Sequence, residues 1–170
     1  MDISITYSGL QEKVYQNKVM RNFNVVSVAK EIALMTEEFG ELCDAYIEDD
    51  HPKIVDAIGD IMVYCLGLSA MFKRQAENII DRNPPQPENL HSLLDYIPYV
   101  GSELGLLAKT YKKSNQKQVD ELDRQEEFLE HIGIMMGYCH VMFTFINENE
   151  MSVLESIVSN NAVRTHQGHL

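Results

Sequence analysis

The chain has no tryptophan, few cysteines and few basic residues. Its 170 residues include 14 Lys and Arg against 26 Asp and Glu, which gives a net charge of −12. This balance argues against a protein that binds the phosphate backbone of a nucleic acid, because such a protein needs a basic surface. It permits binding of a single nucleotide, since a bound divalent cation reverses the local sign of the charge.

The sequence also has no pattern typical of cysteine clusters, secretion or membrane spans. The three cysteines, Cys43, Cys65 and Cys139, belong to no CxxC motif or Cys/His cluster, so we expect buried, reduced thiols. The N-terminus has no basic start followed by an apolar run. The longest apolar stretches are interrupted well short of about 18 residues, so we expect no membrane span. A soluble, cytoplasmic protein is the expectation.

Helical spacing of apolar residues dominates, and no period-two strand or hairpin signal is present. Ser27 and Asp50 have the chemistry of helix N-caps, and Pro52 suits a first helical turn. Pro98 is expected to kink or split its helix. The predicted helices cover about residues 9–21, 27–48, 50–80, 90–113, a long segment ending near 147, and 152–163.

The chain contains two similar halves on either side of a Pro-rich segment. Glu38–Tyr46 matches Glu103–Tyr111 at an offset of 65 (103 − 38), and Asp56–Cys65 matches Glu130–Cys139 at an offset of 74 (130 − 56). Both pairs keep a glycine, a tyrosine and the apolar frame. We interpret this as duplication of a helical hairpin, because two amphipathic hairpins would bury their apolar faces against each other.

The expected architecture is therefore a single all-α domain over 1–170. Its four-helix core would come from a tandem pair of helical hairpins, with flanking N- and C-terminal helices. The expected divisions are an active half over about 26–80, a linker over 81–89, a degenerate half over about 90–148, and a C-terminal helix and tail over 151–170.

The acidic residues differ between the halves. Glu41 corresponds to Leu106, and Asp60 corresponds to Ile134. If these positions faced solvent, the leucine and the isoleucine of the second half would be exposed to water. The pattern therefore favours side chains that point inward. Inward carboxylates are costly unless they are protonated or neutralised by cations.

The spacing of the first-half carboxylates brings four of them together. Glu38 and Glu41 share one face of a helix, as do Asp56 and Asp60 on the next helix. The short turn between makes these helices antiparallel neighbours, so the two pairs can meet. With no His or Cys among them, such oxygen ligands select Mg²⁺, Mn²⁺ or Ca²⁺. Glu37 lies beside this face, where it is placed to hold or deprotonate a water molecule.

A magnesium site of this kind indicates a reaction class. Mg²⁺ in proteins commonly shares its coordination between a few carboxylates and substrate phosphates. We therefore expect attack of water on a nucleoside triphosphate, with Mg²⁺ as cofactor and Mn²⁺ as an alternative.

The stretch TEEFGEL followed by DAIGDIMVY resembles the all-α NTP pyrophosphohydrolases, the MazG-like and dimeric-dUTPase-like superfamily. Their motif is EExxE followed by ExxD, which Glu37, Glu38, Glu41 and Asp60 match. The resemblance covers about residues 30–68. It implies an all-α fold, Mg²⁺ dependence, and cleavage of an NTP or dNTP to a nucleoside monophosphate and pyrophosphate. It also implies a homo-oligomer, most simply a dimer.

The chain departs from the family motif at one position. The residue three before Asp60 is Ala57, and the acid is Asp56, one step earlier. This departure leaves a non-catalytic nucleotide or metal sensor on the same fold as an alternative. Two further alternatives are a solvated acidic stripe and a helical di-metal oxidase, which would bind iron. No motif identifies the preferred base.

Cations are expected near the phosphates of such a substrate. The candidates for substrate binding, which are also ordinary surface residues by type, are Lys53, Arg74, Lys109, Asn161 and Arg164.

Overall fold

The computed structural model describes residues 5–86, 91–114 and 121–163, and it confirms the all-α class. Over these ranges the chain forms seven α-helices, one 3₁₀ helix and no strand. The elements are α1 (Tyr7–Met20), α2 (Val28–Ile47), α3 (His51–Met71), α4 (Ala76–Ile79), η1 (Leu93–Asp95), α5 (Ile97–Ser114), α6 (Glu121–Phe145) and α7 (Glu150–Val163).

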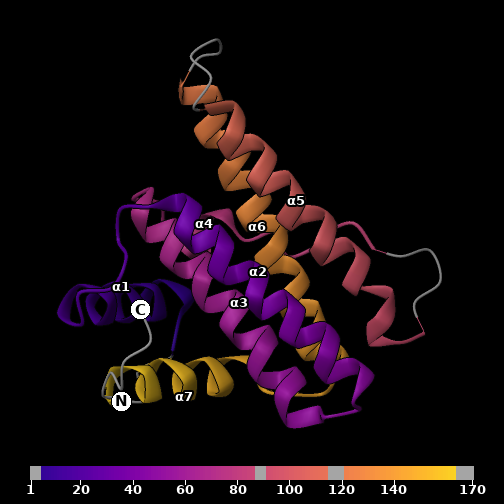
Figure 1. The fold of residues 1–170 in the computed structure, drawn as a ribbon. Coiled ribbons are helices and arrows are strands. Elements are labelled where there is room, and N and C mark those ends of the chain that lie inside the picture. The colour runs from indigo at the N-terminus through magenta and orange to yellow at the C-terminus, as the bar shows by residue number, and fades with distance from the viewer. Residues whose placement is uncertain (1–4, 87–90, 115–120, 164–170) are drawn as a thin grey trace.

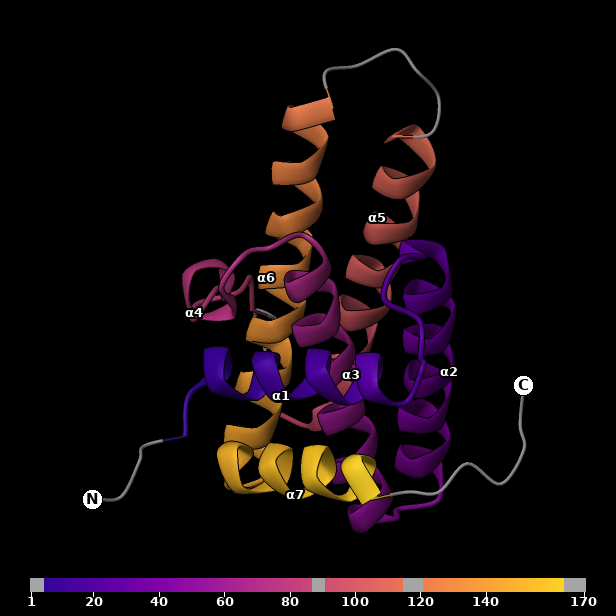
Figure 2. The ribbon, with the colours of Figure 1, turned by 90° about the vertical axis from the view of Figure 1, so that its left-hand side faces the viewer.

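Four long helices form the core of the molecule. α2 lies antiparallel to α3, and α5 lies antiparallel to α6 (Figure 1). The two hairpins pack together through α2 against α5 and α3 against α6. α1 and α7 run across the bundle and pack on α3 (Figure 2). This arrangement agrees with a helical bundle in which flanking helices cover one side.

The two predicted N-caps hold the first hairpin in place. The backbone N–H of Lys30 donates to the Ser27 hydroxyl at 3.3 Å, and that of Lys53 donates to the Asp50 carboxylate at 3.2 Å. Between the two helices, Asp49 adopts φ of 56°, and the N–H of Asp50 donates to Ala45 O at 2.9 Å. This Schellman-type ending reverses the chain within a few residues, so α2 and α3 become direct neighbours.

The predicted extension of the third helix to residue 80 is wrong. α3 ends at Met71, where Lys73 adopts φ of 55° and the N–H of Arg74 donates to Ser69 O at 3.0 Å. The short helix α4 follows as a separate element. Helices that end with a left-handed residue usually have glycine there, but this one has a lysine. The sequence pattern therefore did not show where the helix ends.

Pro98 lies at a break in the segment predicted as one helix over about 90–113, because η1 ends at Asp95 and α5 begins at Ile97. Pro98 is the second residue of α5, where its missing N–H removes no intrahelical bond, so it starts the helix instead of kinking it. The preceding turn, η1, is fixed by the Asp95 carboxylate, which accepts hydrogen bonds from the N–H groups of His91 and Ser92 at 2.8 Å each.

α3 is the central helix of the fold. By length and composition alone it could cross a membrane, contrary to the expectation from the sequence. Of its apolar window, 67% is buried inside the protein, as in the core helix of a bundle. Contacts with α1, α2, α6 and α7 account for this burial.

Glycines let other segments approach the core helices closely. A Cβ atom at Gly59 of α3 would overlap the Ile157 side chain of α7. A Cβ at the corresponding Gly133 of α6 would overlap the backbone carbonyl oxygen of Ile79. Each half therefore uses its matching glycine as a contact point for the segment that covers it.

We predict that Gly133→Ala destabilises the protein by about 1–3 kcal/mol, because the Ile79 backbone must move to admit the methyl group. Gly105→Ala is the matched control. Its Cβ would meet no atom within 4 Å, so replacing a helical glycine there should stabilise by up to about 1 kcal/mol. Urea unfolding followed by circular dichroism measures both, and equal stability of the two variants would contradict the close contact.

Candidate metal centre

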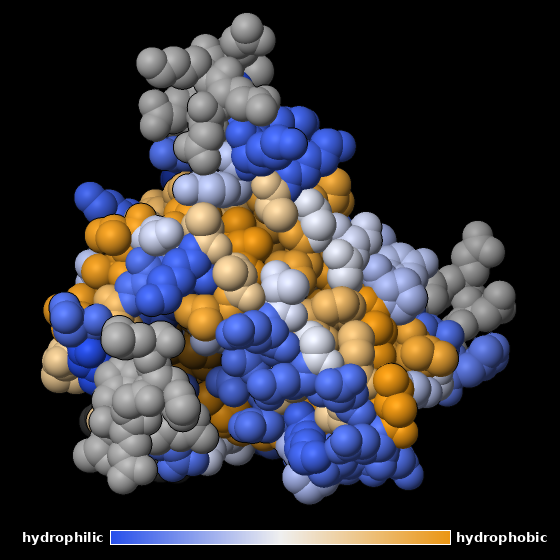
Figure 3. Space-filling model, in the orientation of Figure 1, coloured by the Kyte–Doolittle hydropathy of each residue, from blue (hydrophilic) through white to orange (hydrophobic). Residues whose placement is uncertain are grey.

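The carboxylates predicted to meet do lie near one another across the α2–α3 pair. Glu38 interacts electrostatically with Asp60, Glu41, Asp56 and Glu37, which come from both helices. Burial, followed by these neighbours with Asp60 the strongest, raises the pKa of Glu38 to about 8. Hydrophilic surface covers the lower parts of α2 and α3, beside apolar surface (Figure 3). The other four acidic residues therefore lie within electrostatic range of Glu38.

Four of the five carboxylates lack a partner of opposite charge among the described residues. Within the described residues, no hydrogen bond or ion pair reaches the side chains of Glu37, Glu38, Glu41 and Asp56. Glu38 is half-buried, whereas Glu37, Glu41 and Asp56 are exposed. Of these four, Glu38 therefore depends most on a proton or a cation.

Other buried glutamates of the chain do have such partners. Glu31, 1% exposed, pairs with Lys18. Glu150 pairs with His140 at 2.7 Å and accepts a hydrogen bond from the Tyr7 hydroxyl at 2.8 Å. Glu38 has no such partner among the described residues, and the charged neighbours that raise its pKa are all acids.

The donor set suits a hard divalent cation. Glu38, Glu41, Asp56 and Asp60 provide oxygen ligands alone, which is the preference of Mg²⁺, Mn²⁺ and Ca²⁺. Over the described ranges, no three His, Cys, Asp or Glu side chains are grouped tightly enough to hold a metal ion as they stand. Binding would therefore require these side chains to turn toward a common point, against the mutual repulsion that a cation would remove.

Tyr64 belongs to this site and was missed by the sequence analysis. It follows Asp60 by one helical turn on the same face of α3. Burial raises the pKa of its phenol well above the ordinary value, and the nearby Glu38 and Asp60 raise it further. Tyr64 therefore remains a neutral hydrogen-bond donor beside the carboxylates. Extending the spacing of 56 and 60 by four residues would have found it.

A buried ion pair lies next to Tyr64, at the α1 end of the same helix pair. The Lys18 ammonium bonds to the Glu31 carboxylate and lies 5.4 Å from the centre of the Tyr64 ring. Asn24 completes the group by donating to the other Glu31 oxygen at 2.8 Å. A Cβ at Gly67 would lie 2.9 Å from the Lys18 nitrogen, so this glycine makes room for it. The sequence analysis did not identify Lys18, because one lysine in a surface-type helix carries no signal.

The residues predicted to bind substrate are dispersed. Lys53 is exposed and pairs with Glu48 at 2.8 Å and Asp50 at 3.2 Å, and Arg74 pairs with Glu126 of α6.

Lys109 is exposed on α5. Asn161 lies near the end of α7, where its backbone oxygen accepts a hydrogen bond from Arg21 of α1. Arg164 lies outside the described residues. Of this predicted set, Lys53 is nearest in sequence to the carboxylates, one turn before Asp56.

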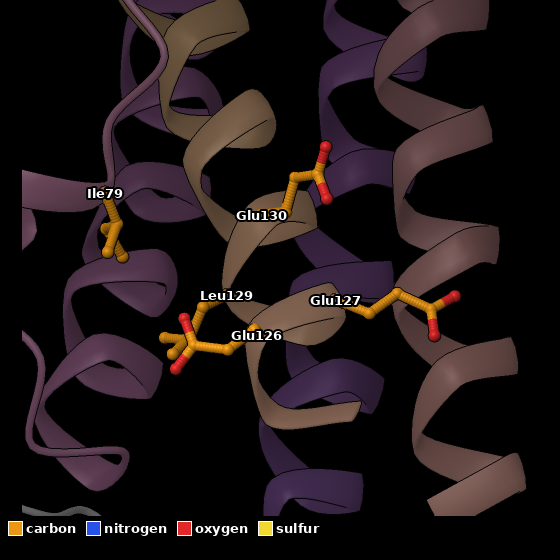
Figure 4. Close-up of a pocket in the computed structure, with 5 residues that line it drawn as sticks. All are labelled: Ile79, Glu126, Glu127, Leu129 and Glu130. Atoms are coloured by element: carbon orange, nitrogen blue, oxygen red, sulfur yellow. The ribbon is translucent and has the colours of Figure 1, made fainter. Parts of the chain in front are cut away.

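A second acidic surface has a different character. A pocket of about 490 Å³ is lined by Ile79, Glu126, Glu127, Leu129 and Glu130. Its three glutamates point in different directions, with Glu126 turned toward Ile79 and Glu127 turned away (Figure 4). No group of carboxylates converges there, so the α2–α3 site remains the candidate metal centre.

Comparison with models of known protein families, with curated proteins and with solved structures gave no match.

We predict that the metal-free protein becomes less stable as the pH rises from about 4.5 to about 8. Glu38 has a pKa of about 8 in the folded protein against 4.5 ordinarily, so in this range the folded state binds more protons than the unfolded state. Glu38→Gln should flatten this slope, and Mg²⁺ should oppose it. Urea unfolding across the pH range measures the slope. An unchanged slope in Glu38→Gln would contradict the raised pKa.

We also predict that Lys18→Met lowers the free energy of unfolding by about 3–5 kcal/mol, because it leaves the buried Glu31 carboxylate without its cation. Lys18→Met combined with Glu31→Leu should recover most of that loss, since neither charge is then buried. Thermal unfolding of the two variants makes the comparison. If the single variant were as stable as the double variant, the pair would not be compensating a buried charge.

Proposed function

We propose that the protein is a Mg²⁺-dependent nucleoside triphosphate pyrophosphohydrolase. The observation that carries the proposal is the half-buried Glu38, which has four acidic neighbours, a pKa of about 8 and no cationic partner among the described residues. The resemblance of TEEFGEL and DAIGDIMVY to the MazG-like motif supports the same reaction. A dimer acting in the cytoplasm on free nucleotides completes the proposal.

In this proposal Glu38, Glu41, Asp56 and Asp60 hold the metal. A divalent cation bound there would neutralise substrate phosphates and lower the pKa of a bound water molecule. Cleavage consumes one water molecule: its oxygen bonds to the α-phosphorus, the bond from that phosphorus to the bridging oxygen breaks, and pyrophosphate leaves.

Two neighbouring side chains have separate roles. Glu37 is exposed beside Glu38 and accepts the proton that the attacking water loses. Tyr64, a neutral donor close to Glu38 and Asp60, donates a hydrogen bond to a phosphate oxygen. Both roles depend on positions that the α2–α3 pair fixes.

A non-catalytic nucleotide or metal sensor is the second candidate. It is favoured by Ala57, which is 3% exposed and occupies the position that the family motif assigns to an acid. Such a protein would bind a metal–nucleotide complex without hydrolysing it, so turnover distinguishes the two functions.

The test is pyrophosphate release from a panel of ribo- and deoxyribonucleoside triphosphates in the presence of Mg²⁺, Mn²⁺ or EDTA. We expect metal-dependent release with one preferred base. Glu38→Gln, Glu41→Gln and Asp60→Asn should each abolish turnover and retain the helical circular dichroism spectrum. Glu37→Gln should lower kcat by about 10²–10⁴-fold and leave metal affinity unchanged.

Glu103→Gln is the matched control, because Glu103 is the second-half counterpart of Glu38. It should leave turnover nearly unchanged. Metal and nucleotide binding without any release would favour the sensor, and absence of both would refute the metal centre itself.

A further inference from the structure

The second hairpin repeats the surroundings of Glu38 at Glu103. Glu103 occupies the equivalent position on α5, and Tyr138 of α6 is the equivalent of Tyr64 at the offset of 74 residues (138 − 64). Burial followed by Glu103 raises the pKa of Tyr138 to about 12, just as burial followed by Glu38 raises that of Tyr64. Both halves therefore keep a buried glutamate beside a neutral tyrosine.

The two glutamates differ in what faces them. The His131 Nδ1 atom lies 2.8 Å from the Glu103 carboxylate, and the two side chains are only 15% and 12% exposed. The position equivalent to His131 in the first hairpin is Ala57, at the same offset of 74 (131 − 57). An imidazole thus contacts Glu103 from the position where the first hairpin has only a methyl group.

The second hairpin has fewer acidic residues around its glutamate than the first hairpin has. Leu106 and Ile134 stand where Glu41 and Asp60 stand in the first hairpin. Glu130, the counterpart of Asp56, is exposed at the surface pocket on α6 (Figure 4). One buried carboxylate remains instead of a cluster, and one imidazole is enough to satisfy it.

We propose that His131 takes the place of the metal ion in the second hairpin, so that each chain holds one metal centre and the residue at positions 57 and 131 decides which hairpin has it. With alanine at position 57, no side chain from that position pairs with Glu38, so an external cation can bind it. With histidine at position 131, the imidazole contacts Glu103 and occupies the place of the cation. This inference rests on the proposed metal centre at Glu38, whereas the pairing of Glu103 with His131 is seen in the structure directly.

Mn²⁺ binding to the full chain tests this inference without any nucleotide. Electron paramagnetic resonance of free Mn²⁺ gives the affinity and the stoichiometry. We expect Glu103→Gln to bind Mn²⁺ like the unmodified chain, and Glu38→Gln to lose binding. Ala57→His should weaken binding at least tenfold, because the new imidazole pairs with Glu38.

The reciprocal variant combines His131→Ala with Leu106→Glu and Ile134→Asp, which restores in the second hairpin the residue types of the first. It should gain Mn²⁺ binding in addition to that at Glu38. The same triple change made with Glu103→Gln controls for nonspecific attraction by the added acids and should lose the gain. Circular dichroism confirms folding, and if Ala57→His is unfolded the reciprocal variant decides alone.

The outcomes separate the two proposals. Loss of Mn²⁺ binding in Glu103→Gln, or no gain in a folded reciprocal variant, would overturn the role given to His131. If the unmodified chain binds no Mn²⁺, the proposed metal centre fails. A gain in the reciprocal variant would in that case still support the inference about the second hairpin.

Discussion

A carboxylate that leaves water has to find a proton or a positive charge, and the arrangement of this protein follows from that requirement. The buried glutamates Glu31 and Glu150 have their partners within the chain. Glu31 has a lysine from another helix, and Glu150 has an imidazole and a phenol. Glu38 is half-buried, has four acidic neighbours and has no ion pair with a described residue. The proposed cation would supply at Glu38 the positive charge that Glu31 and Glu150 obtain from side chains of the chain itself.

The carboxylate positions could be predicted from the sequence because they depend on local geometry. Spacings of three and four residues put Glu38 with Glu41 and Asp56 with Asp60, and the capped turn at Asp50 sets the two helices side by side. Helical class and the start of each helix in the first hairpin follow from the same local rules. Predicting these features does not require knowing which helices pack against each other.

The features that the sequence did not reveal depend on long-range contacts or on unusual backbone conformations. Lys18 matters because α1 brings it to Glu31, and nothing near Lys18 in the sequence indicates that meeting. The end of α3 depends on Lys73 in a left-handed conformation, which most residue types disfavour. Pro98 could have been a kink or a start, and only the preceding turn at Asp95 decides between them.

The glycine at position 59 has a consequence for how the site can change. It is a point of close approach between α3 and Ile157 of α7, and it directly precedes Asp60. A shift of the acidic pattern by one residue along α3 would put a side chain under α7 and push that helix away. The packing of α7 against Gly59 therefore limits where an acidic side chain can stand along α3. A substitution that moved a carboxylate to position 59 would lower the stability of the fold.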